Sequence, residues 1–194
     1  MHVPILSRCG ALYRLFLHRS FHNLRLDKRN QLHTFFIFTH RIGVVSAILS
    51  SHGETLHKMV NAALDDLYQY DSYLITHNLH EQSITFRFAL YLHRRLSESQ
   101  FSEYNLDLEY NKNGNDLKIV RSKQNGARPD LILHKRGNNE NNILIIEFKK
   151  YHYRRNDDSQ KIKDFMDDRD QFRFRYGAFI VLGQYRDTVK IYWE

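Results

Sequence analysis

The segment over residues 130–148 constrains the fold of this chain more than any other part of its 194 residues. Two apolar runs, residues 131–133 and 143–146, flank a polar, asparagine-rich stretch that contains Gly137. Short apolar runs bounded by turn residues are typical of buried strands. The pattern predicts a β-hairpin whose turn lies near residues 137–140.

The position of this turn sets which residues of the two strands face each other. An antiparallel pair that closes there places Asp130 opposite Glu147 and His134 opposite Ile143. Directly opposed residues have Cβ atoms about 4.5–5.5 Å apart, so two carboxylates would repel one another unless a cation lies between them. A divalent cation that prefers oxygen ligands meets this need. Side chains alternate along a strand, so Lys149 shares a face with Glu147.

The apolar residues of the hairpin indicate two strands at the centre of a sheet. Leu144 and Ile146 are expected opposite Leu133 and Leu131, and isoleucines 132 and 145 fall on the other face, so both faces are expected to be buried. Charges are common at strand ends, and a Glu-Phe-Lys tripeptide alone is weak evidence of a site. Two acids and a lysine at one end of a buried pair nevertheless favour a functional site.

Pro129-Asp130, followed after sixteen residues by Glu147-Phe148-Lys149, resembles the signature of the PD-(D/E)XK, or restriction-endonuclease-like, nuclease superfamily. Residues 109–111, 128–130, 134–137 and 147–150 are also similar to a group of small uncharacterised bacterial proteins with this core. The resemblance covers about residues 57–194. It implies a phosphodiesterase site in a restriction-endonuclease-like fold.

The chemistry of phosphodiester hydrolysis gives each residue of this signature a role. A bound Mg²⁺, or Mn²⁺ in its place, stabilises charge on the phosphate and generates a hydroxide, with Asp130 and Glu147 as direct ligands. The resemblance implies that the Phe148 carbonyl is another ligand. Lys149 is a compact charge on a flexible stem, and we expect it to orient the attacking water and to neutralise developing charge.

A further acid is expected from the helix that precedes the sheet. Glu81 stands three residues before Ile84 and seven before Phe88, so it extends the stripe of that helix that faces the core. The resemblance implies a metal-linked acid on such a helix. Two alternatives remain open: Glu81 favours the helix N-terminus only, or Asp107 or Glu109, which share a face of the next strand, reaches the metal instead.

Other basic and polar residues around the signature have several candidate roles. Candidate phosphate contacts are Arg128, Lys150, Lys161 and Lys163, although a solvated surface charge is the more common explanation for each. Glu109 is a candidate partner for Arg128. His134 is expected to be structural or exposed, because a lone histidine in a strand is seldom a metal ligand.

Hydrophobic periodicity predicts the other elements. Amphipathic helices are expected over residues 56–70, 79–96 and 159–172. Strands are expected over residues 105–110, 117–120, 130–134, 143–148, 177–182 and 188–193. This order predicts an α/β fold with a mixed central β-sheet flanked by α-helices.

The basic excess of the chain lies outside this predicted domain. Residues 1–58 carry eight Lys and Arg against two Asp and Glu, and residues 59–194 carry twenty-one against twenty, which together give the formal net charge of +7. Residues 1–55 form a basic, histidine-rich segment, expected to be a nucleic-acid arm, a helical extension or a solvated leader. Residues 56–194 form the nuclease-like domain, and a shortened chain that begins at Met59 is expected to fold.

The sequence therefore predicts a Mg²⁺-dependent nuclease, with DNA as the substrate that the resemblance favours and a homodimer as a candidate assembly. The alternatives are a catalytically inactive nuclease-fold binding module, because DNA-binding domains are usually more basic, and a phosphodiesterase that acts on RNA. Cys9 is the single cysteine, which excludes an intrachain disulfide and fits a cytoplasmic location. Neither a membrane span nor a signal peptide is expected.

Overall fold

The computed structural model describes residues 51–150, 158–167 and 171–194. The chain divides into two units between residues 51 and 52, and the second, His52–Glu194, begins slightly before the boundary expected at residue 56. The predicted basic segment, residues 1–55, lies almost wholly outside the described residues. Every predicted site residue belongs to the second unit.

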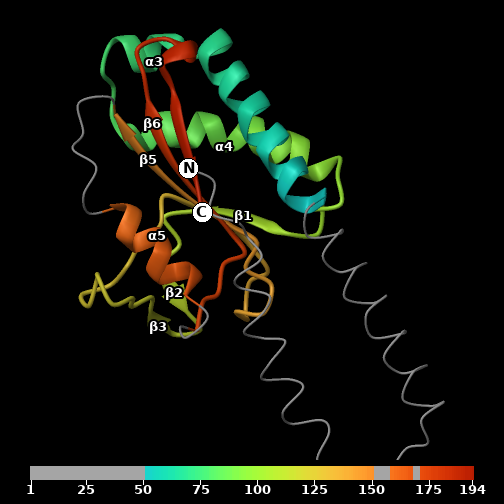
Figure 1. Ribbon diagram of the computed structural model, residues 1–194, viewed down its shortest axis with the longest axis vertical. Coiled ribbons are helices and arrows are strands. Elements are labelled where there is room, and N and C mark those ends of the chain that lie inside the picture. The colour runs from blue at the N-terminus through green and yellow to red at the C-terminus, as the bar shows by residue number, and fades with distance from the viewer. Residues whose placement is uncertain (1–50, 151–157, 168–170) are drawn as a thin grey trace, which may run out of the picture. The chain divides into compact units, whose positions relative to one another are not determined.

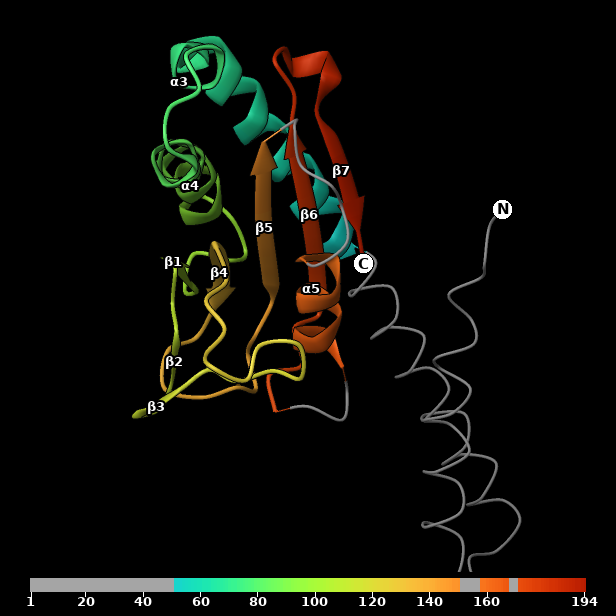
Figure 2. The same ribbon diagram turned by 90° about the vertical axis from the view of Figure 1, so that its left-hand side faces the viewer.

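A mixed five-stranded sheet forms the centre of this second unit (Figures 1 and 2). Its order is β1 (Asn105–Leu108), β4 (Leu131–His134), β5 (Leu144–Lys150), β6 (Tyr176–Leu182) and β7 (Lys190–Trp193). Strands β5 and β6 are parallel, and the other neighbours are antiparallel. This sheet confirms the predicted mixed α/β class.

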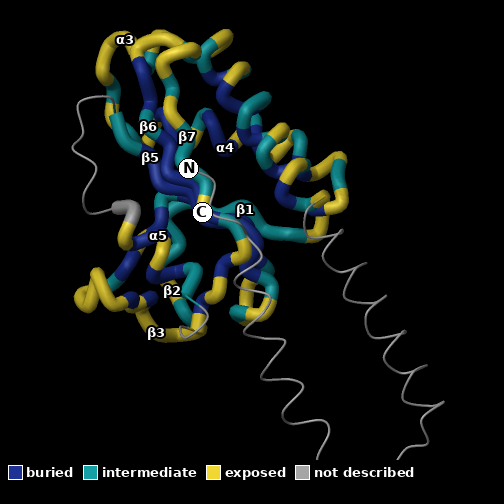
Figure 3. Tube along the Cα trace, viewed as in Figure 1, coloured by how far each residue is buried: buried dark blue, intermediate teal, exposed yellow. Residues whose placement is uncertain are grey.

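Helices cover both faces of the sheet, because its central strands are apolar on both sides. The helix over residues 51–70 and α4 (Glu81–Ser97) share one core cluster with Leu131, Leu133, Leu144 and Ile146. On the other face α5 (Asp158–Met166) packs through Ile162 and Phe165 against Ile132 and Ile145. Figure 3 shows the resulting burial of β5 and β6 between the helical layers. The prediction of a hairpin buried on both faces is confirmed.

The helix expected over residues 159–172 is shorter in the structure. Helix α5 ends at Met166, and Arg173 takes a left-handed backbone conformation with φ of 47°. The Phe174 N–H donates to the Phe165 carbonyl at 3.0 Å, so the chain turns back over the helix. Phe172 still reaches the core, with its ring 5.2 Å from that of Phe165. Its apolar character was therefore mistaken for helical periodicity.

The strand expected over residues 117–120 is also wrong for most of its length. Only β3 (Asp116–Leu117) is extended, and it pairs with β2 (Lys112–Asn113). The Lys118 N–H donates to the Asn111 carbonyl at 2.7 Å, and the Lys118 carbonyl accepts from Ala127 at 2.6 Å. The backbone is thus satisfied by a loop, and the main sheet gains no strand here.

The ends of several other elements differ from those expected. Helix α4 begins at Glu81, because the His80 side chain accepts a hydrogen bond from the Gln82 N–H at 3.3 Å and caps the first turn. Strand β1 ends at Leu108, and Thr188 belongs to the 3₁₀ turn Arg186–Thr188 that precedes β7. The short helix α3 (Ser72–Thr76) was not predicted: it has one buried residue and no side-chain cap, so it leaves no periodic signal.

A shortened chain that begins at Met59, which the sequence predicts to fold, is expected to be less stable than one that begins at His52. The missing turn of helix carries Leu56, which is fully buried, and His57, whose ring lies 3.8 Å from that of Trp193. Burial of one leucine alone stabilises a fold by about 1.5–3 kcal/mol. Urea denaturation of both chains measures the difference, and equal midpoints would show that this turn is dispensable.

Candidate functional site

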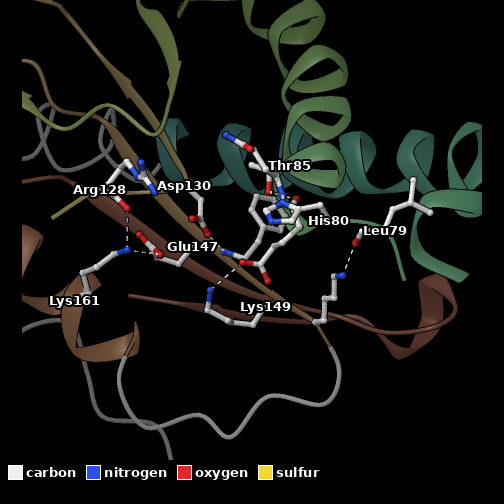
Figure 4. Close-up of polar contacts among 12 residues, drawn as sticks. Leu79, His80, Thr85, Arg128, Asp130, Glu147, Lys149 and Lys161 are labelled. Atoms are coloured by element: carbon white, nitrogen blue, oxygen red, sulfur yellow. Dashed lines mark hydrogen bonds and ion pairs between the residues drawn. The ribbon is translucent and has the colours of Figure 1, made fainter. Parts of the chain in front are cut away.

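The β4–β5 register confirms the pairing on which the predicted site depends. Leu131 pairs with Ile146, Ile132 with Ile145 and Leu133 with Leu144, so the next positions toward the strand ends are Asp130 and Glu147. The Phe148 N–H donates to Asp130 Oδ2 at 2.7 Å, which holds this carboxylate against β5. Figure 4 shows Asp130, directly before β4, near Glu147 of β5.

Lys149 reaches toward helix α4. Its Nζ lies 3.0 Å from Glu81 Oε1, and both side chains are only partly exposed. Figure 4 shows this contact between the strand and the first turn of the helix. The predicted inward orientation of Glu81 is confirmed, because the acid turns to the sheet end that carries the other site residues.

Glu147 is held by a lysine from the helix on the same face of the sheet. The Lys161 Nζ lies 2.7 Å from Glu147 Oε2 and donates to the Arg128 carbonyl at 3.1 Å. Glu147 is 1% exposed and Lys161 is 7% exposed. An ion pair at this depth is little screened by solvent, so it strongly couples α5 to β5 and to the segment before Asp130.

A small cavity of about 70 Å³ brings several of these acids together. It is lined by Asp130, Glu81 and Glu109, with His80, Gln82, Thr85 and Leu108 completing its wall. Both competing acids therefore reach the cavity, with Glu81 held by Lys149 and Glu109 lying 3.4 Å from Arg128. The expected Glu109–Arg128 pair is confirmed.

Asp107 and Glu109 do not share a strand face, contrary to expectation. Glu109 has φ of 48°, which ends the alternation of β1 and turns its side chain to the cavity. Asp107 instead pairs with Arg136 and, at 2.8 Å, with His134 Nε2. His134 is 2% exposed, so its predicted structural role is confirmed.

The candidate phosphate contacts divide into different environments. The Arg128 side chain is 61% exposed beside Glu109, and Lys163 is exposed near Glu194. The Lys150 Nζ donates to the carbonyls of Asn78 and Leu79 and thereby ties β5 to the turn before α4. Lys161 is buried against Glu147, so the alternative explanation as a solvated surface charge is wrong.

Two features of the site were missed from sequence. His80 lines the cavity and caps α4, and this role had no signal in the sequence, because histidine is not one of the preferred N-cap residues. The role of Lys161 did have a signal. It lies one helical turn before the buried Phe165, and residues four apart share a helix face.

The donor atoms of the site suit a hard divalent cation, which prefers carboxylate and carbonyl oxygens. Two of these carboxylates form ion pairs with lysines: Glu147 with Lys161, and Glu81 with Lys149. Within the described part of the chain, no three His, Cys, Asp or Glu side chains lie close enough to hold a metal ion. The residue types fit Mg²⁺, while the lysines hold two of the predicted ligands.

Burial raises the pKa of Asp130 above its ordinary value of 3.8. The Phe148 N–H and the charges of Lys149 and Lys161 oppose this rise, and Glu81 adds to it. The folded state thus binds the proton more tightly than the unfolded state does. Asp130 therefore contributes its whole stabilisation at pH values below its ordinary pKa. This stabilisation is lost as the pH rises through the higher pKa that Asp130 has in the folded protein.

We expect Asp130→Asn to be more stable than the parent at neutral pH, because asparagine keeps an oxygen for the Phe148 N–H without a buried charge. The difference should vanish in acid, where Asp130 itself is protonated. Urea denaturation at the two pH values tests this. A variant less stable than the parent at neutral pH would show that the carboxylate is net stabilising.

Comparisons with family models, with curated proteins and with solved structures give no match. No helix in the described ranges is long and apolar enough to cross a membrane.

Proposed function

We propose that this chain is a Mg²⁺-dependent phosphodiesterase that cleaves nucleic acid, with DNA as the leading substrate. The observation that carries the proposal is that Asp130, Glu147 and Lys149 lie at one end of the sheet, where Lys149 contacts Glu81 of α4. Charged residues at the end of two buried strands, with a further acid on the adjoining helix, favour a site with chemistry to perform. The resemblance of the signature to PD-(D/E)XK nucleases supports phosphodiester hydrolysis, and it is the main support for DNA.

Each residue of the site has its own role in the proposed reaction. Asp130, Glu147, Glu81 and the Phe148 carbonyl are the candidate metal ligands. A bound Mg²⁺ supplies Lewis acidity and a hydroxide at neutral pH. Lys149 binds the attacking water or a phosphate oxygen, and Glu81 positions its ammonium through the 3.0 Å contact. The backbone N–H of Phe148 fixes the orientation of Asp130.

Nicking of supercoiled plasmid by the full chain tests this proposal. We expect cutting with Mg²⁺ or Mn²⁺ and none with EDTA. Asp130→Asn should lower the rate by at least about 100-fold, since a lost metal ligand removes several kcal/mol of charge stabilisation. Asp116→Asn, the same change at an exposed position of β3, is the control and should cut normally. Equal cutting by both variants would contradict the proposal, and so would calorimetry that detects no divalent-metal binding.

A catalytically inactive binding module is the second candidate. It is favoured by the buried Glu147–Lys161 pair, in which a lysine ammonium already neutralises a predicted metal ligand. Such a module would bind nucleic acid equally well with Mg²⁺ and with EDTA and would cut neither DNA nor RNA. Cutting assays with DNA and with RNA distinguish this module from a phosphodiesterase that acts on RNA.

A further inference from the structure

An apolar cavity lies on the outer side of α4, next to the candidate site. It has a volume of about 420 Å³ and is lined by Leu74, Gln82, Ser83, Phe86, Arg87 and Leu108. Phe86 is 50% exposed, which is unusual for a phenylalanine on a helix whose opposite face forms the core. A volume of this size falls in the range of about 300–1,000 Å³ that small-molecule sites occupy.

This cavity is a neighbour of the acidic one. Gln82 and Leu108 line both cavities, and they come from the first turn of α4 and from the end of the edge strand β1. Figure 2 shows α4 alongside β1 and β4. A ligand that places one part against Asp130 and Glu81 therefore has an aromatic platform within the same groove.

We propose that the Phe86 cavity binds an unpaired nucleobase of the strand whose phosphodiester lies at the Asp130 site. This inference rests on the proposed function and gives it a substrate class: single-stranded or locally unpaired nucleic acid. A nucleotide joins an anionic phosphate to a flat aromatic base through one sugar, which matches a charged cavity beside an apolar one. The base stacks on the exposed Phe86 ring.

The polar residues of the cavity are consistent with this ligand. The Gln82 amide offers both donors and an acceptor to a base edge. Arg87 is held by Asp71 at 2.7 Å and by Tyr91 at 3.1 Å, so it leaves the cavity mainly apolar. A base within a duplex has both faces covered by its neighbours and cannot stack on Phe86 without leaving the helix. The groove therefore selects unpaired nucleotides over intact duplex.

Fluorescence anisotropy of the full chain with a labelled thymidine oligonucleotide tests the proposal. EDTA prevents cutting, and the same strand with abasic residues is the matched ligand. We expect the normal strand to bind about 5- to 150-fold more tightly than the abasic one, and Phe86→Ala to remove this preference. Phe86→Tyr should retain it. Leu90→Ala, one turn along α4 at a 43% exposed leucine outside the cavity, should bind as the parent does.

Other outcomes of this test are informative as well. Equal binding of normal and abasic strands, equal binding of duplex and single strand, or equal losses in Phe86→Ala and Leu90→Ala would each overturn the proposal. An RNA strand of matching sequence tells whether the base comes from DNA or RNA. The readout is binding alone. Failure to cut both plasmid and single-stranded DNA with Mg²⁺ therefore counts against the phosphodiesterase, whereas loss of base preference counts against the Phe86 cavity.

Discussion

Replacing Lys149 with methionine is expected to lower the rate of phosphodiester cleavage by about 10²–10³-fold, the usual cost of removing one group that stabilises transition-state charge. Methionine keeps a long apolar stem, so the packing of a side chain that is only 19% exposed should change little. The substitution therefore removes the ammonium group beside Glu81 and keeps the stem of the side chain. Initial rates of plasmid nicking with saturating Mg²⁺ measure the effect, and Lys190→Met on the exposed start of β7 is the matched control.

Companion variants separate a chemical role of Lys149 from a structural one. If Lys149 merely anchors α4 through Glu81, Lys149→Met should lower the free energy of unfolding together with the cutting rate. If the ammonium acts on water or phosphate, Lys149→Met should lower the cutting rate and leave the urea midpoint close to that of the parent. Lys149→Arg should also stay slow, because a planar guanidinium does not replace a compact charge. Normal cutting by Lys149→Met would remove this lysine from the mechanism.

The alternation and turn of the central hairpin were sufficient to predict much of the candidate site. Side chains in a strand alternate with a period of two. With the turn at residues 137–140, only one register buries the apolar residues of both strands. That register is observed, and it brings Asp130 against the strand of Glu147 and Lys149. Helical spacing likewise predicted the inward side of Glu81, since Ile84 and Phe88 are buried.

The errors arose where backbone conformation or a distant partner decides the structure. A non-glycine residue with positive φ, such as Glu109 or Arg173, has no reliable sequence signal, so the end of β1 and the reversal after α5 were missed. Lys118 satisfies its backbone within a loop despite apolar neighbours. Lys161 looked like a surface charge because the helix pattern did not show that Glu147 lies beneath it.

Replacing Lys161 with methionine is expected to lower the free energy of unfolding by about 3–5 kcal/mol, the cost of breaking a buried ion pair from one side. The ammonium lies 2.7 Å from Glu147, and its loss leaves that carboxylate without its nearest lysine in a site with little solvent. Lys163→Met, two residues along α5 at a side chain that is 54% exposed, is the control and should cost less than about 1 kcal/mol. Urea denaturation with EDTA measures both changes.

A second substitution tests whether the charge on Glu147 is the cause. Adding Glu147→Gln to Lys161→Met should restore most of the lost stability, because the pair of changes leaves no buried charge. The same reasoning connects this ion pair to the proposed metal. A divalent cation that binds Glu147 replaces the missing ammonium, so Mg²⁺ should stabilise Lys161→Met more than the parent chain. If Mg²⁺ stabilises Lys161→Met and the parent equally, Glu147 is not one of its ligands. If Lys161→Met has the same stability as Lys163→Met, the buried ion pair is not what holds α5 to the sheet.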